Sequence, residues 1–350
     1  MKRIKKAVHI LLAVTVLAVL NQCYLSKQGA YLLRYNSRTE DIDTVLNNGN
    51  LPEDSRNMLM LVKEIKEYAV KEIGLKDDKN YTRYVMIEKD YLVDVVSACE
   101  KDRFEAYQWR FPFFGSFPYK GFYEHEDAEK EAEKLRKKDL DVYIRKVDAF
   151  STLGYFDDPV YSFMKDYSAY SIANLIIHEQ THATVFFKNR IKFNEELATF
   201  IGNEGALQFI RIKYGAESDL YKDLLDYQKD LDTFFELIRN LYDELNTVYE
   251  EETGREYKLE RRDEMFNAFR EEISVLYNTY FITDTFRGIE KISLNNAYIM
   301  SHLRYAGELH LFYNLYENLG CDLKKMVHIL IQVKNNRGDP RDFIREYMKL

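Results

Sequence analysis

Two histidines stand four residues apart inside an apolar segment with the spacing of a helix. They are His178 and His182, within residues 171–187. Residues four apart share a helical face, about 6 Å apart along the axis, so both imidazoles can reach one zinc ion. Glu179 lies about 100° further round the helix, where a carboxylate can deprotonate a metal-activated water without binding the metal. The segment therefore predicts one Zn2+ per chain, with Glu179 as the catalytic base.

The two histidines could also serve the fold without binding a metal. They could be hydrogen-bonded residues of the core or of the surface, although burying two imidazoles beside a carboxylate without partners costs free energy. Two imidazoles and a carboxylate would also accept other divalent ions. Zinc is therefore inferred from the type of ligand.

A hydrolytic zinc site needs a third protein ligand, and we expect it on the next helix. Asn189 can adopt a left-handed conformation that turns the chain after the first helix. Asn194 is then expected to cap a second helix over residues 194–214. That helix could return alongside the first one and bring a carboxylate to the histidines.

Three carboxylates of this second helix compete for the ligand role: Glu195, Glu196 and Glu204. Glu195 shares its face with small residues that would let the two helices approach closely, namely Ala198, Thr199 and Gly202. We therefore predict Glu195 as the third ligand, with the Thr199 hydroxyl available to support it. Acidic residues in a first helical turn also complement the helix dipole, which would account for Glu195 or Glu196 without a metal.

The segment 193–200, which reads Phe-Asn-Glu-Glu-Leu-Ala-Thr-Phe, follows the His-Glu-x-x-His motif as in the gluzincin metallopeptidases. The chain specifically resembles the bacterial putative aminopeptidase family of exported, lipoprotein-like proteins. Other blocks similar to that family are residues 117–121, 140–143, 149–154, 156–159 and 294–297, together with Tyr305. The resemblance covers most of residues 23–335. It implies a zinc metallopeptidase with His178, His182 and Glu195 as metal ligands and Glu179 as base.

Peptide hydrolysis also needs a hydrogen-bond donor for the oxyanion of the tetrahedral intermediate, usually a Tyr or a His. Because the chain contains 28 Tyr, the residue type alone cannot select one. We select Tyr305, with His302 as second choice, although both could be packing or surface residues of a helix. Residues 155–159 could line the substrate cleft or could form only a turn.

The first 22 residues have the pattern of a targeting segment. A basic start precedes an apolar run over residues 7–20, which has the size of a signal-peptide core and is short for a transmembrane helix. Cys23 follows and resembles the lipidated Cys of bacterial lipoprotein signals. A lipoprotein signal, an uncleaved anchor and simple secretion all export the body of the chain. We expect an extracytoplasmic protein anchored to the membrane through residues 1–22 or through a lipid on Cys23.

The charge balance argues against a protein that grips nucleic acid phosphates. Fifty Lys and Arg against 58 Asp and Glu give a net charge of -8. Removing residues 1–22 takes away four basic groups and no acidic group, which leaves 46 against 58, or -12. Cys99 and Cys321 would then be the remaining thiols. They could pair in an oxidising compartment but are too few for a disulfide framework.

The apolar periodicity predicts a predominantly helical α+β fold. Residues 23–165 are expected to form a helix and a small sheet, and residues 166–350 a helical zinc-peptidase region with a charged helical hairpin over 219–280 that turns at Gly254. In the first region we expect a helix over 52–74, strands over 91–98 and 141–147, an aromatic segment over 111–123 and a charged helix over 127–138.

These features favour a membrane-tethered zinc peptidase that hydrolyses peptides, with aminopeptidase action as the narrower expectation. An endopeptidase or cell-wall peptidase is an alternative from the same chemical class. A rival from another class is a non-catalytic surface lipoprotein that binds a partner through its acidic hairpin, in which any zinc is structural. A full set of four protein ligands would favour that rival, and Glu204 and Asp166 are the conceivable candidates for the fourth.

Overall fold

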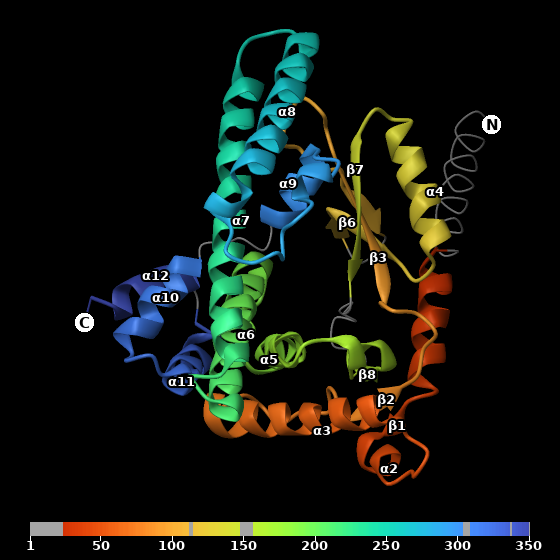
Figure 1. Ribbon diagram of the computed structural model, residues 1–350, viewed down its shortest axis with the longest axis vertical. Helices are drawn as coiled ribbons and strands as arrows, with labels where there is room; N and C mark the ends of the chain where they lie inside the picture. Colours follow the sequence, from red (N-terminus) through yellow and green to blue (C-terminus); the bar gives the residue numbers. More distant parts are fainter. Residues whose placement is uncertain (1–23, 112–114, 148–156, 304–308, 337, 350) are drawn as a thin grey trace, which may run out of the picture.

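The computed structural model describes residues 24–111, 115–147, 157–303, 309–336 and 338–349, and this part of the chain is predominantly helical with small sheets (Figure 1). The predicted fold class is confirmed. The predicted targeting segment, Cys23 and Tyr305 lie outside the described residues. None of the described helices combines the length and the apolar character needed to cross a bilayer.

The β-structure consists of three small sheets, ordered β1-β2-β8, β6-β3-β7 and β4-β5. The strands are β1 (Glu40–Asp41), β2 (Arg83–Val85), β3 (Val93–Cys99), β4 (Trp109–Phe111), β5 (Gly115–Phe117), β6 (Tyr119–Phe122), β7 (Asp141–Val147) and β8 (Val160–Tyr161). β3 is buried along its whole length and pairs antiparallel with β6 and β7. The strand expected over residues 141–147 is confirmed, and the one expected over 91–98 begins two residues later.

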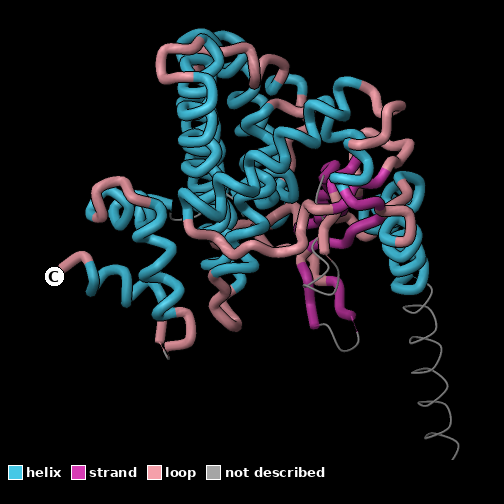
Figure 2. Tube along the Cα trace, turned by 90° about the horizontal axis from the view of Figure 1, so that it is seen from below, coloured by secondary structure: helices cyan, strands magenta, loops and turns pink. Residues whose placement is uncertain are grey.

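Helices cover both faces of the β6-β3-β7 sheet. The charged helix α4 (His125–Arg136) buries Ala128, Ala132 and Leu135 against apolar side chains of β3 and β7. The helix α9 (Asn296–Leu303) contacts the same two strands from the other side (Figure 1). Figure 2 shows the strands gathered on one side of the molecule and the C-terminal helices on the other.

A second layer is built from helices that pack on one another. The predicted helix over residues 52–74 is observed as α3 (Glu53–Tyr68), which continues into the π-helical turn η1 (Ala69–Ile73) and ends at Gly74 with a left-handed φ of 79°. The buried stripe of α3 includes Met58, Leu59, Val62 and Ile65. This stripe packs in the same core as α5 (Ala169–Thr184) and α6 (Ile191–Tyr214).

The predicted charged hairpin is confirmed as α7 (Asp219–Glu250) and α8 (Arg255–Tyr280), with Gly254 at the turn. Two buried polar contacts attach this hairpin to neighbouring parts of the fold. Asp230 accepts hydrogen bonds from the backbone N–H groups of Ile282 and Thr283, each at 2.7 Å. Arg262 forms a 3.1 Å ion pair with the buried Asp141 of β7.

The remaining helical elements are short ones elsewhere in the fold and three helices, the last in the chain, that form its C-terminal side (Figure 1). They are α2 (Ile42–Leu46), the 3-10 turns η2 (Ser162–Asp166) and η3 (Ile289–Lys291), α10 (Leu309–Asn318), α11 (Leu323–Val333) and α12 (Pro340–Tyr347). Cys99 and Cys321 are both free thiols, the first buried and the second exposed.

Candidate metal centre

The helix α5 presents both histidines of the motif on one face. It begins at Ala169, where the Ser168 hydroxyl accepts the backbone N–H of Ser171 at 3.0 Å and caps the helix. Its apolar face is buried through Ile172, Ala173, Ile176 and Ile177. Burial of this face leaves the other face, with His178 and His182, turned toward α6.

Three donor atoms converge at this point. The Nε2 atoms of His178 and His182 lie 3.2 Å apart, and the Glu195 carboxylate oxygens lie 3.7 Å from the first and 3.6 Å from the second. A tetrahedral zinc ion with bonds of about 2.0–2.1 Å separates its ligand atoms by about 3.3 Å. These separations and the two-imidazole, one-carboxylate donor set therefore fit a zinc ion.

The Glu195 carboxylate also controls the charge of this cluster. Burial would raise the pKa of Glu195, but its contacts with the two imidazoles outweigh burial and hold that pKa well below its ordinary value. Burial would lower the pKa of His182, but Glu195 outweighs that effect and raises it. The three side chains thus form a strongly interacting group, in which a cation is favoured between the donors.

The start of α6 differs from the prediction. The helix begins at Ile191 and not after Asn194, so Glu195 is in its second turn. The Asn194 side chain is buried and serves another purpose: its amide accepts the backbone N–H of Phe187 and donates to the carbonyl of the same residue, both at 2.9 Å. It therefore closes the loop between α5 and α6, in which Asn189 has the expected left-handed conformation, with φ of 61°.

The close approach of α5 and α6 depends on Gly202. A Cβ atom at this position would lie 3.1 Å from the Asn174 carbonyl oxygen and 3.2 Å from the Cβ of His178. Both distances are shorter than ordinary van der Waals contact, and neither neighbour is the free end of a flexible side chain. The absence of a side chain at Gly202 thus lets Glu195, two turns earlier on α6, reach the histidines.

We expect Gly202→Val to weaken zinc binding, because the added side chain pushes α6 away from His178. The distance between the Glu195 carboxylate and the two imidazoles then increases. Overpacking of this kind costs about 1–3 kcal/mol, and part of that cost falls on the metal site. Competition with a coloured zinc chelator measures the affinity. Gly29→Val is the matched control, since Gly29 is also within a helix and a Cβ there meets nothing within 4 Å. Equal zinc affinities in the two variants would contradict this role of Gly202.

The other carboxylates named from the sequence lie elsewhere. Glu196 is 1% exposed and forms an ion pair with Arg341 of α12, while Lys192 lies 3.7 Å from it. Burial raises the pKa of Glu204, which is hydrogen-bonded to Tyr313 of α10. Neither residue, nor Asp166, joins the three-donor group within the described residues.

The charge of the base candidate Glu179 affects two residues to which sequence reasoning assigned no catalytic or ligand role. These residues are Asp158 and Tyr81. Burial, followed by the charges of Glu179, Asp157 and Asp78, raises the pKa of Asp158 to about 7. Asp158 lies within the segment expected either to line the cleft or to form a turn. Tyr81 had no sequence signal, because only the fold brings it to this region.

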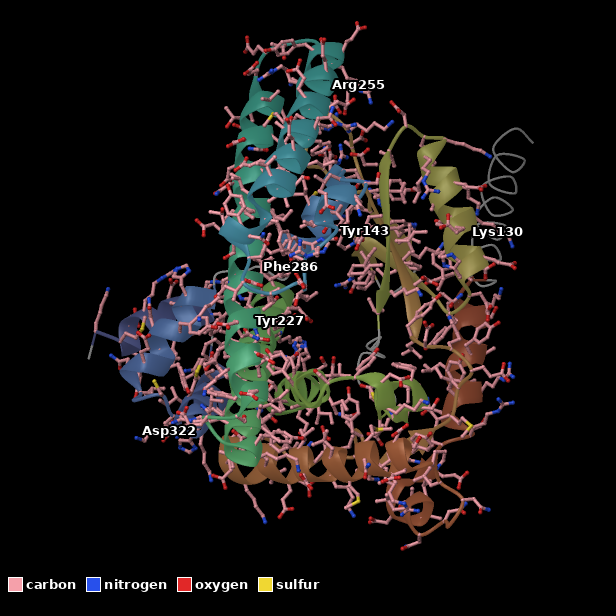
Figure 3. The ribbon with its side chains drawn as sticks, viewed as in Figure 1. Lys130, Tyr143, Tyr227, Arg255, Phe286 and Asp322 are labelled. Carbon is pink, nitrogen blue, oxygen red and sulfur yellow. The ribbon has the colours of Figure 1, made fainter. Side chains whose placement is uncertain are left out.

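The second choice for the oxyanion donor, His302, lies in an aromatic cluster. Its Nδ1 is 2.9 Å from the carbonyl oxygen of Tyr298, and its ring packs against Tyr143, Phe234 and Tyr298. In Figure 3, Tyr143 and Phe286 approach this region from β7 and from the loop after α8. Among the described residues its contacts do not include the three metal donors.

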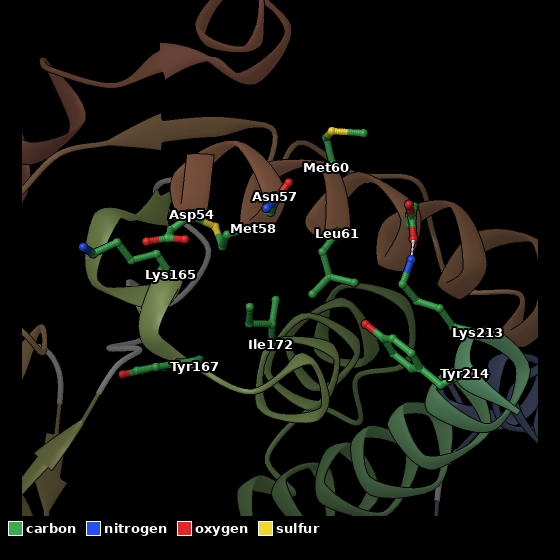
Figure 4. A pocket seen from close by; sticks show the side chains of 11 residues that line it. Asp54, Asn57, Met58, Met60, Leu61, Lys165, Tyr167, Ile172, Lys213 and Tyr214 are labelled. Atoms are coloured by element: carbon green, nitrogen blue, oxygen red, sulfur yellow. Dashed lines mark hydrogen bonds and ion pairs between the residues drawn. The ribbon is translucent and has the colours of Figure 1, made fainter. Parts of the chain in front are cut away.

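The cavity drawn in Figure 4 is separate from the metal centre. It has a volume of about 400 Å³ and lies between α3, η2, α5 and the end of α6. Its lining includes Met58, Leu61, Ile172 and Tyr214 but none of the three metal donors and not Glu179. This cavity therefore does not belong to the group of candidate metal donors.

Comparison with known proteins identifies one family. The model of the family described as "Putative aminopeptidase" matches residues 23–342, nearly the whole chain. Neither the curated proteins nor the solved structures gave a match.

Proposed function

The chain belongs to the "Putative aminopeptidase" family, and we propose that it is a zinc-dependent metallopeptidase that removes residues from the amino terminus of peptides. The observation that carries the proposal is the convergence of His178, His182 and Glu195, with Glu179 next to the first of them in the chain. Two imidazoles and one carboxylate are the ligand set of a hydrolytic zinc site with one position left for water or substrate.

In this proposal Glu179 transfers the proton of the attacking water to the leaving amine. A zinc ion held by the three donors would polarise the scissile carbonyl and lower the pKa of the attacking water. Glu179 accepts a proton from that water as it attacks the carbonyl carbon. The same carboxyl then delivers the proton to the leaving amine, so that it returns to its ionised form.

The openness of the centre supports catalysis over a structural role for the metal. The Glu195 side chain is 41% exposed, and those of His178 and His182 are 18% and 22% exposed. No fourth His, Cys, Asp or Glu of the described chain completes the group. A closed structural zinc site would have four protein ligands and no access for water.

We also propose that the protein acts outside the cytoplasm while attached to a membrane. The basic and apolar pattern of residues 1–22 and the position of Cys23 support export and anchoring. The substrate would then be an extracytoplasmic peptide. The net charge of the exported chain gives no support to a nucleic acid partner.

Removal and return of zinc tests the proposed function. The purified chain is expected to contain one zinc and to shorten unblocked peptides from the amino terminus. A chelator should stop this reaction, because the donors alone do not activate water, and one equivalent of zinc should restore it. Metal content by mass spectrometry and peptide products by liquid chromatography measure the two outcomes. Hydrolysis that persists after complete zinc removal would rule out the proposed mechanism.

A further inference from the structure

The segment between η1 and β2 runs along the half of α5 that carries Glu179. The backbone N–H of Lys76 donates to the Thr184 hydroxyl at 2.9 Å. The Gln180 side-chain amide donates to the Lys76 carbonyl at 3.4 Å. Because Gln180 lies inside the metal motif of α5 and Thr184 lies two residues after it, this segment starts beside the catalytic helix.

The other end of the same segment holds the turn that contains Asp158. The backbone N–H of Asp158 donates to the Asn80 side-chain oxygen at 2.9 Å. The backbone N–H of Tyr81 donates to the Asp158 carbonyl at 2.6 Å. Tyr81 has a φ of 56°, which is unusual for a bulky residue and persists only where surrounding contacts hold it. Both the N–H and the carbonyl of Asp158 are therefore held by residues 80–81, and its carboxyl group lies within reach of the charge of Glu179.

The Asp158 carboxylate has no cationic partner in the described part of the chain. It is partly exposed and, among the described residues, accepts no hydrogen bond and forms no ion pair. The charges that act most on it are those of Glu179, Asp157 and Asp78, and all three are negative. Because like charges raise the cost of ionising a partly buried carboxyl, a cation bound here would relieve that cost.

The Tyr81 side chain gives a second and independent indication of a ligand. It is only 2% exposed, yet within the described residues its hydroxyl has no hydrogen-bond partner. After burial, Glu179 and Asp158 have the largest effects on its pKa, and both raise it. The Tyr81 oxygen is not among the fully buried polar atoms that lack a partner, so it keeps some access to solvent. A group that donates a hydrogen bond can therefore bind to it.

We propose that Asp158 binds the free α-ammonium group of the substrate's first residue, and that the Tyr81 hydroxyl oxygen accepts a second of its hydrogen bonds. An α-ammonium group has a positive charge and three N–H donors, which complement a carboxylate and a phenol oxygen. Fixing the ammonium beside Glu179 places the first peptide bond, and not a later one, at the catalytic base. This assignment rests on the proposed function and names the residue that would restrict it to amino-terminal cleavage.

A binding experiment tests this assignment without requiring turnover. The full-length chain carrying Glu179→Gln is loaded with zinc and titrated with tetra-alanine or with N-acetyl-tetra-alanine, and calorimetry gives each affinity. A hydrogen bond to a charged group is worth about 1.5–3 kcal/mol, so the unblocked peptide should bind at least about tenfold more tightly. Asp158→Asn in the same background should reduce that ratio to about one, and Tyr81→Phe should reduce it in part. Asp157→Asn is the matched control and should leave the ratio unchanged.

Two outcomes would overturn the assignment of Asp158. One is equal binding of the two peptides by the Glu179→Gln protein, and the other is a ratio that survives Asp158→Asn. A third such outcome is a protein that binds two zinc ions and loses one of them on Asp158→Asn. Asp158 would then be a metal ligand. Circular dichroism checks that each variant is folded. Hydrolysis by the unaltered chain is measured separately, so failure of the peptidase proposal remains distinguishable from failure of this one.

Discussion

Replacing Glu179 by Gln is expected to reduce kcat for peptide hydrolysis by at least about 100-fold, because a positioned general base contributes about 10²- to 10⁴-fold to such reactions. The amide has nearly the same size as the carboxyl group but cannot accept the proton of the attacking water. Zinc binding should be retained, since the three donors are on His178, His182 and Glu195. Steady-state kinetics and metal analysis on the same preparation measure both effects.

The combination of these two readouts makes the prediction for Glu179 specific. A variant that had merely unfolded would lose zinc as well as activity. Glu72→Gln is a suitable control, because it removes the charge of an exposed glutamate in η1 and should leave kcat and zinc content unchanged. Activity of the Glu179→Gln variant within threefold of the unaltered chain would exclude Glu179 as the base.

The parts of the fold that could be predicted from the sequence are those with a long regular apolar pattern. The long helix α7 of the hairpin repeats apolar residues at helical spacing over many turns, and α3 does the same over four turns. The β1-β2-β8 sheet was not foreseen. Its strands have only two or three residues each, and β8 joins β2 from a distant part of the chain. Tertiary contacts determine such short pairings, and two or three residues are too few to show an apolar repeat in the sequence.

The same distinction applies to the metal centre. His178 and His182 are related by helical spacing, so their proximity could be predicted without a structure. Glu195 could be placed near them because Gly202 signalled a close helix pair. The start of α6 was predicted wrongly because the Asn194 amide bonds to Phe187 across the loop instead of capping a helix. Asp158 was named only as part of the segment 155–159, and Tyr81 was not named, since only the pairing of distant segments brings them toward Glu179.

The two adjacent acids Glu195 and Glu196 illustrate what a helix does to neighbouring side chains. Successive residues point about 100° apart, so one carboxylate faces α5 while the next faces α12. Glu196 is therefore held by Arg341, far along the chain, and anchors the C-terminal helix to α6. This difference in environment, and not the residue type, makes Glu195 the candidate metal ligand.

Glu195→Ala is therefore expected to weaken zinc binding by more than 100-fold, because it removes one of three direct ligands, and loss of an outer partner alone costs about 10- to 100-fold. His178→Ala should have an effect of similar size. Glu196→Gln is the matched control: it changes the adjacent acid, keeps a hydrogen-bond acceptor for Arg341 and should retain zinc. Zinc competition titrations on folded protein measure the three affinities. If Glu196→Gln released the metal and Glu195→Ala kept it, Glu196 would be the ligand. The α6 helix would then have to be turned about its axis by about 100°, the angle between successive residues. If neither changed the affinity, the zinc would be bound elsewhere and the two histidines would be structural.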